Sequence, residues 1–121
     1  NFLGRLANDQ MPGVYNSYPI YVLCSNYEGN PKTLLEAMSC GLAVIGTNVP
    51  GIREIIINGR NGILIPNNEP SLLLESIQTL FLNRSLRKKL GVNARRTILE
   101  NNSMKKAVIS EYDTYNKLIN F

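Results

Sequence analysis

Apolar runs of strand length alternate with segments of helical spacing along the first part of the chain. Near-continuous apolar runs cover residues 19 to 25, 42 to 47 and 61 to 66. A run without alternation is typical of a parallel strand that is buried on both faces. A further strand is expected at Phe2-Leu3, because the sequence begins inside an apolar run. From this beginning we also expect the chain to be a piece of a longer protein.

Helices are expected between these strands and throughout the second half of the chain. Helices are expected over residues 8 to 17, from Pro31 to Gly41 and over residues 50 to 60. From Ser71 onward, apolar residues recur in three helical stripes, at 72 to 81, 86 to 99 and 104 to 119. The pattern predicts one α/β domain over residues 1–121, with a parallel sheet of about four strands and a helical tail from about 71 to 121.

Composition narrows the chemistry that this chain can perform. The 121 residues include no histidine, which removes the commonest general base and most zinc sites. Cys24 and Cys40 lack metal-ligand spacing and are expected as reduced, partly buried thiols in the cytoplasm. No apolar run approaches the roughly 18 residues of a membrane span. Carboxylates, backbone amides and cations remain as the groups that can carry function.

The stretch NYEGNPKTLLEAMSCG, residues 26 to 41, places two glutamates around a predicted helix start. Asn30 fits the N-cap and Pro31 the first helical position, where its missing N–H costs nothing. The apolar residues of this helix fall on one side of the helical wheel. Glu36 projects almost opposite, on the same face as Lys32 one turn earlier. We therefore expect Glu36 to lie off the core.

A helix start that follows a parallel strand is where open α/β sheets bind ligands, because its amides and dipole favour a phosphate. Glu36 lies about 7 to 8 Å along the helix from such a phosphate, roughly the span from a diphosphate to a ribose. A carboxylate can accept both hydroxyls of the ribose diol. Glu28, before the turn, would meet the group that the diphosphate carries. The alternative from the residues alone is two solvated glutamates, with Glu36 paired to Lys32.

The run from Ser25 to Pro66 resembles the nucleotide-binding core of retaining glycosyltransferases of the GT-B fold, and the later segment LGVNARR resembles their next helix. In that family, two glutamates are separated by seven residues and are followed by a Gly turn, a strand and Asn-Gly before a last strand. The matched positions are Ser25, Glu28, Gly29, Pro31, Leu34, Leu35, Glu36, Ala37, Met38, Gly41, Val44, Gly51, Glu54, Ile55, Ile56, Gly59, Gly62 and Pro66. The resemblance implies a partial Rossmann-like sheet with helices on both faces.

The resemblance also implies roles for single residues. Glu36 would hold the ribose of a nucleotide-sugar, and Glu28 would contact the transferred sugar and serve as the catalytic carboxylate. The segment Gly29, Asn30, Pro31, Lys32 and Thr33 would meet the diphosphate or the sugar, with no amide from Pro31. Lys32 either faces the phosphates or pairs with Glu36, and Arg5 is expected near the base. Glu54 is expected in a supporting role.

The family pattern further implies partners that lie outside this chain. The donor would be a UDP-, GDP- or ADP-sugar, with no metal or other cofactor, and the acceptor a polysaccharide or a lipid-linked sugar. The acceptor domain, two strands of the donor domain and the phosphate-binding cations precede the residues present, so the isolated chain is expected to be inactive. The Phe2-Leu3 strand would be displaced, frayed or paired with another molecule, and the next strand would expose an edge through which chains could self-associate.

Other classes of protein fit the same residues less well. A glycoside hydrolase would need its two carboxylates to face each other across a sugar, which glutamates flanking a helix start do not do. A basic segment from Arg84 to Lys106 suits a solvated face, or weak contact with anionic lipid at the inner face of the membrane. It lacks the aromatic residues expected for nucleic acid, which we do not expect as a partner. A nucleotide-binding unit without catalysis is the remaining alternative.

Overall fold

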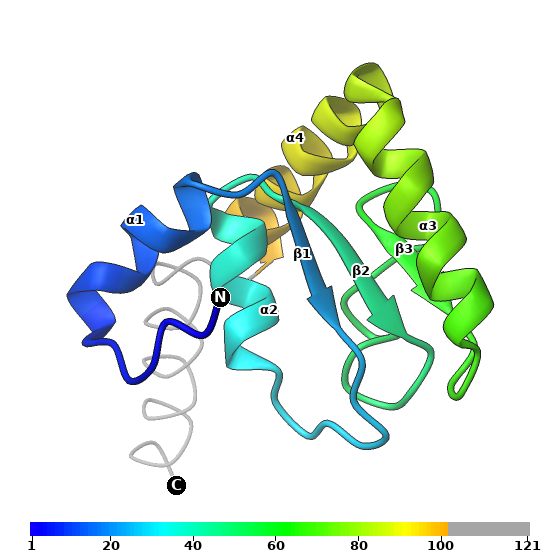
Figure 1. The fold of residues 1–121 in the computed structure, drawn as a ribbon, viewed down its shortest axis with the longest axis horizontal. Coiled ribbons are helices and arrows are strands. Elements are labelled where there is room, and N and C mark those ends of the chain that lie inside the picture. The colour runs from blue at the N-terminus through cyan, green and yellow to red at the C-terminus, as the bar shows by residue number, and fades with distance from the viewer. Residues whose placement is uncertain (102–121) are drawn as a thin grey trace, which may run out of the picture.

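The computed structural model describes residues 1–101 and contains a three-stranded parallel sheet (Figure 1). The strands are Ile20–Leu23 (β1), Ala43–Thr47 (β2) and Ile63–Ile65 (β3), in the order β1-β2-β3. In their register Tyr21 pairs with Val44 and Gly46 with Leu64. All five residues of β2 are buried. The continuous apolar run at this position therefore marks the central strand, as expected.

Helices cover both faces of the sheet. A short 3-10 turn, Asn8–Gln10 (η1), leads into α1 (Met11–Asn16), and α2 (Lys32–Ser39) connects β1 to β2. The chain then continues through α3 (Pro70–Leu82) and α4 (Arg84–Asn101). Figure 1 shows α3 and the pair α1 and α2 on opposite sides of the strands.

Alternate residues of β2 belong to two separate cores. Val44 packs with the buried residues of α1 and α2, whereas Ala43 and Ile45 pack with Leu80 of α3. Helix α4 contributes to both cores, with Leu90 in one and Ala94 in the other. The predicted α/β class with helices on both faces is confirmed.

One expected strand is absent from the described residues. The segment at Phe2-Leu3 is not a strand, and both side chains are exposed, Phe2 completely. A strand there would need a hydrogen-bonded neighbour, and β1 pairs only with β2 within residues 1–101. Over this range the sheet therefore has three strands rather than four, and the expected unpaired edge lies on β1. The third helical stripe, at 104 to 119, lies outside the described residues.

The segment from 50 to 60 forms turns rather than the expected short helix. Gly51 takes a φ of +87°, which a right-handed helix cannot include, and the N–H of Ile57 donates to the side chain of Asn61 at 2.7 Å instead of to a carbonyl one turn earlier. The φ of +78° at Gly59 fits the stop expected at Asn58-Gly59. The apolar spacing that suggested a helix buries Ile52 and Ile56 instead. The segment thus serves as a packed loop between β2 and β3.

Candidate functional site

The candidate site lies at the carboxyl end of β1, where the chain turns into α2. The helix begins one residue later than expected, with Pro31 rather than Asn30 as the N-cap and Lys32 as the first helical residue. The N–H of Lys32 donates to the carbonyl of Asn30 at 2.9 Å, and the first i→i−4 bond runs from Leu35 to Pro31 at 3.1 Å. Among residues 1–101, no side chain forms a cap hydrogen bond at this start. The amides of Thr33 and Leu34, which lie between these two bonds, can therefore donate to a ligand or to water.

Glu28 is held in place by hydrogen bonds from the loop that follows β1. The hydroxyl of Ser25 donates to Glu28 Oε1 at 2.8 Å. The hydroxyl of Thr47, which is buried at the end of β2, donates to the carbonyl of Ser25 at 2.6 Å. Glu28 is half-buried, so its carboxylate has a defined direction and keeps an accessible part. Gly29 and Asn30 beside it are exposed.

Gly51 supports the same loop from behind. A Cβ at this position would overlap the carbonyl oxygen of Glu28 and would lie 3.3 Å from that of Gly29. The positive φ of Gly51 also disfavours other residues. Sequence reasoning matched Gly51 to a family pattern without giving it a role, because its contact joins segments more than twenty residues apart.

Glu36 lies off the buried face of α2, as predicted, but it is not simply solvated. Leu34, Ala37 and Met38 fill the core, while the Glu36 side chain is 34% exposed. The hydroxyl of Tyr15 on α1 donates to Glu36 Oε2 at 3.0 Å. This contact was not predicted, because nothing in the sequence around Tyr15 distinguishes it from an ordinary core residue.

Lys32 pairs loosely with Glu36 in this structure. Its Nζ lies 4.0 Å from Glu36 Oε1, and its side chain is 73% exposed. An exposed i,i+4 pair contributes only a few tenths of a kcal/mol. The pair is therefore weak enough for Lys32 to move when an anion binds nearby.

A second tyrosine contacts the first turn of α2. The hydroxyl of Tyr21 on β1 donates to Thr33 Oγ1 at 2.6 Å. The rings of Tyr15 and Tyr21 meet edge to face, with centroids 6.0 Å apart. The pKa of Tyr15 is raised well above its usual range, mainly by burial and to a smaller extent by the hydrogen bond to Glu36. Burial also raises the pKa of Tyr21, so both hydroxyls remain donors at neutral pH.

Arg5 and Glu54 are not joined to these residues. Arg5 lies in the irregular segment before η1, and its side chain is exposed. Glu54 is exposed on the turn segment after β2. Their expected roles near the base and as a supporting group remain predictions.

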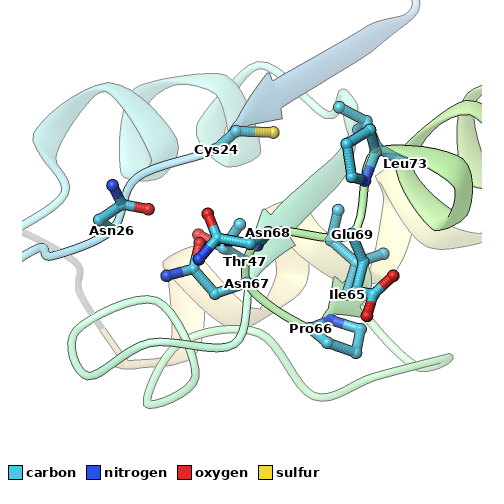
Figure 2. A pocket seen from close by; sticks show the side chains of 10 residues that line it. Cys24, Asn26, Thr47, Ile65, Pro66, Asn67, Asn68, Glu69 and Leu73 are labelled. Atoms are coloured by element: carbon cyan, nitrogen blue, oxygen red, sulfur yellow. Dashed lines mark hydrogen bonds between the residues drawn. The ribbon is translucent and has the colours of Figure 1, made fainter.

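A small pocket lies at the carboxyl ends of all three strands, next to the Glu28 loop (Figure 2). It has a volume of about 160 Å³, and Cys24, Thr47, Asn67 and Asn68 line it. Figure 2 shows the Cys24 thiol pointing toward Leu73 at the start of α3. Cys24 is exposed rather than partly buried as expected, because β1 ends before it, whereas Cys40 is half-buried. No pattern in the sequence indicated this pocket, which forms from the loops after β1 and β3, the end of β2 and the start of α3.

Two of the basic residues on α4 cap other helices. Arg87 donates to the carbonyls of Leu80 and Phe81 at the end of α3, at 2.9 and 3.0 Å. Arg95 donates to the carbonyl of Ser39 at the end of α2, at 3.0 Å. These contacts give part of the basic segment a structural role. Lys105 and Lys106 lie outside the described residues.

Residues 1–101 hold no group of three His, Cys, Asp or Glu side chains placed to bind a metal ion. Within the same range, no helix has the length and apolar character needed to cross a membrane.

A parallel sheet with helices on both faces and an uncapped helix start at its carboxyl edge defines a Rossmann-like α/β unit. Residues 1–97 match the sequence model of the family described as glycosyl transferases group 1. The chain belongs to this family, as its resemblance to the GT-B enzymes implied.

Curated relatives agree with this assignment. The chain is 34% identical over 121 residues to an uncharacterized glycosyltransferase of Methanocaldococcus jannaschii, covering 98% of this chain and 31% of the relative. It is 31% identical over 113 residues to N-acetyl-alpha-D-glucosaminyl L-malate synthase of Bacillus anthracis, covering 93% of this chain and 29% of that protein. The chain thus spans less than a third of these relatives.

Solved structures share the fold. Sucrose-phosphate synthase from Thermosynechococcus elongatus superposes with a TM-score of 0.94 at 24% identity, over 98% of this chain and 30% of that chain. A mutant of TarM from S. aureus, in complex with fondaparinux, alpha-GlcNAc-glycerol and UDP, gives a TM-score of 0.82 at 25% identity. That match covers 88% of this chain and 22% of TarM.

Proposed function

We propose that this chain is the donor-binding part of a transferase that moves a sugar from a nucleotide-sugar to an acceptor, with retention of configuration. The observation that carries the proposal is the uncapped start of α2, which has Glu28 on one side and Glu36 on the other. A diphosphate at the helix start would receive hydrogen bonds from amides of the first turn and would complement the helix dipole. The two carboxylates would then bind the two ends of the donor.

In this arrangement each glutamate has a separate task. Glu36 accepts hydrogen bonds from the ribose hydroxyls, and Glu28 accepts them from hydroxyls of the transferred sugar, where it acts as the catalytic carboxylate. Lys32 leaves its weak pair with Glu36 to face the phosphates. The donor needs no metal ion in this proposal, because amides and cations neutralise the diphosphate.

UDP-sugars are the first donors to test. The TarM complex contains UDP, and a structure of Anabaena HepE contains UDP and glucose. Sequence relatives include a Streptococcus agalactiae enzyme named as a UDP-N-acetylglucosamine–peptide transferase, 38% identical over 71 residues. GDP- and ADP-sugars serve as the comparison donors.

The acceptor side belongs to the rest of a longer parent protein in this proposal. The chain covers about a third of its relatives, and the N-terminal acceptor domain would supply the acceptor pocket and the missing cations. The isolated chain would bind donor weakly and would not transfer sugar. The parent would work in the cytoplasm, peripheral to the membrane where its acceptor is lipid-linked.

The test is calorimetric titration of the full-length parent with UDP, UDP-glucose and UDP-N-acetylglucosamine, and with the corresponding GDP and ADP ligands. Glu36→Ala should weaken nucleotide and nucleotide-sugar alike, by about 10- to 100-fold, since it removes hydrogen bonds to a charged acceptor. Glu28→Ala should weaken only the ligands that carry a sugar. Glu75→Ala, an exposed glutamate on α3, is the control and should change nothing. Equal losses for both site variants would show that the division of roles is wrong.

A further inference from the structure

Tyr15 joins an apolar environment to a carboxylate of the candidate site. The residue is 6% exposed and packs in one core cluster with buried residues of α2 and the sheet. Its hydroxyl donates to Glu36 Oε2 at 3.0 Å, across 21 positions of sequence. A phenylalanine would fill the same core position without this bond. The hydroxyl is therefore the part of Tyr15 that packing does not explain.

The hydrogen bond restricts the Glu36 carboxylate. A glutamate on a helix surface can adopt several rotamers, and binding a ligand then requires that one of them be selected. A buried hydroxyl without a partner is unfavourable, so Tyr15 favours the rotamer that places Oε2 within its reach. Glu36 is thus oriented before a ligand arrives.

The bond leaves Glu36 enough accepting capacity for a diol. An ionised carboxylate offers about four lone-pair sites on two oxygens, and Tyr15 uses one of them. The Oε1 atom pairs with the exposed Lys32, at 4.0 Å, and this weak pair is readily displaced. Two hydroxyl groups can therefore bind Glu36 while the Tyr15 contact persists.

We propose that Tyr15 is a positioning residue for ribose recognition, whose hydroxyl holds Glu36 in the orientation that accepts both ribose hydroxyls. This inference rests on the proposed function, in which Glu36 binds the ribose. Tyr15 itself does not touch the nucleotide. Its contribution appears only with ligands that carry the diol, because its action passes entirely through Glu36.

Tyr21 provides a matched control within the same cluster. Its ring contacts that of Tyr15, and its hydroxyl also donates to the first turn of α2, but to Thr33 rather than to Glu36. Tyr21→Phe and Tyr15→Phe each remove one hydroxyl from neighbouring rings. Only the Tyr15 variant changes the support of Glu36.

The experiment titrates the full-length parent with UDP and with 2′,3′-dideoxy-UDP, and with the GDP and ADP pairs in parallel. The measured quantity is the ratio of the two affinities, which isolates the ribose hydroxyls from the base and the diphosphate. Tyr15→Phe should lower this ratio about 3- to 10-fold and leave dideoxynucleotide affinity unchanged. Tyr21→Phe should leave the ratio at its wild-type value. In Glu36→Ala, adding Tyr15→Phe should not change the ratio further.

Two results separate failure of this inference from failure of the proposed function. Suppose that Glu36→Ala lowers the ratio, but Tyr15→Phe either lowers the affinities for UDP and 2′,3′-dideoxy-UDP equally or changes neither affinity. Tyr15 is then only a structural residue. If Glu36→Ala keeps the wild-type ratio, or no nucleoside diphosphate binds the parent, Glu36 does not bind ribose and the proposed function fails with it. Thermal unfolding of each variant verifies that the ratio is measured on folded protein. Single variants are compared with the wild type, and the double variant is compared with Glu36→Ala.

Discussion

The two ends of α2 differ in how they satisfy the backbone. At its carboxyl-terminal end, the helix closes with a Schellman motif. The N–H of Leu42 donates to the carbonyl of Ala37 at 3.2 Å, and the N–H of Gly41 donates to the carbonyl of Met38 at 3.0 Å. Arg95 adds a bond to the carbonyl of Ser39. At its start, no side chain caps the helix. One end is thus completed by the protein, and the other remains available to a ligand.

Each end is also contacted closely by a glycine from another segment. Gly91 of α4 lies against the carbonyl of Gly41, and Gly51 lies against the carbonyl of Glu28. Neither position has room for a Cβ. Similar close backbone packing therefore supports the core at one end of α2 and the Glu28 loop at the other. Substitutions at the two glycines should therefore have different consequences.

Gly91→Ala should produce the largest loss of stability. The added Cβ overlaps the Gly41 carbonyl between two rigid elements, so the free energy of unfolding should fall by about 3 kcal/mol. Urea unfolding followed by circular dichroism measures this change. Gly13→Ala on α1 is the control, because no atom of the described residues lies within 4 Å of its new Cβ, and it should be neutral or slightly stabilising. Equal stability of the two variants would contradict the close packing of α4 on the end of α2.

Gly51→Ala should combine a smaller loss of stability with a loss of donor binding. The positive φ and the overlap with Glu28 should together lower the free energy of unfolding by about 2 kcal/mol, since a loop relaxes more easily than a helix. The displaced Glu28 should weaken nucleotide-sugar binding about tenfold in calorimetry. Gly59 has a similar positive φ, +78°, but within residues 1–101 no atom lies within 4 Å of an added Cβ, so Gly59→Ala isolates the backbone strain. If both variants bind donor equally well, Gly51 does not position Glu28.

The same comparison shows which features can be predicted from sequence. The end of α2 was predictable, because Gly41 after an apolar helical stripe is a local signal. The continuous apolar run of β2 likewise predicted a buried parallel strand. The position of Glu36 off the buried face followed from helical spacing alone. These features depend on residues that lie close together in the chain.

Features that depend on distant residues were not predictable. The bond between Tyr15 and Glu36 joins two helices separated by a strand, and tyrosine spacing on α1 carries no sign of it. At Phe2-Leu3 the residues alone suggested a strand, whereas the family pattern implied that it would lose its neighbours, and within residues 1–101 no strand forms there. The helix expected at 50 to 60 did not form because Gly51, with a φ of +87°, packs against the carbonyl of Glu28, which is distant in sequence. The pocket beside Cys24 needs the loops after β1 and β3, the end of β2 and the start of α3 together.

Stability should decrease at alkaline pH through the tyrosines at the start of α2. Burial raises the pKa of Tyr15, so above about pH 10 the unfolded chain loses a proton that the folded chain keeps. The free energy of unfolding should then fall as pH rises, by at most about 1.4 kcal/mol per pH unit for this group. Urea unfolding from pH 8 to 11 measures the slope. Tyr15→Phe should reduce it, whereas the exposed Tyr18→Phe should not; equal slopes would contradict the burial of the hydroxyl.

Arg95→Ala should have the smallest effect, because it removes one bond from an end that is already closed. Its exposed side chain donates only to Ser39, and the Schellman motif remains, so we expect a loss of about 0.5 kcal/mol and unchanged nucleotide affinity. Arg87→Ala is the variant to compare with Arg95→Ala, because it also removes an arginine that donates to the end of a helix. It removes two bonds from the end of α3, where Asn83, with φ −108° and ψ 86°, does not form a left-handed cap.

The Arg87 variant should therefore lose more, about 1 kcal/mol, in the same urea unfolding experiment. If Arg95→Ala is the more damaging of the two, the closure of α2 depends on its arginine rather than on its backbone bonds. The end of α2 would then resemble its start, because both would need a group from outside the helix to satisfy them.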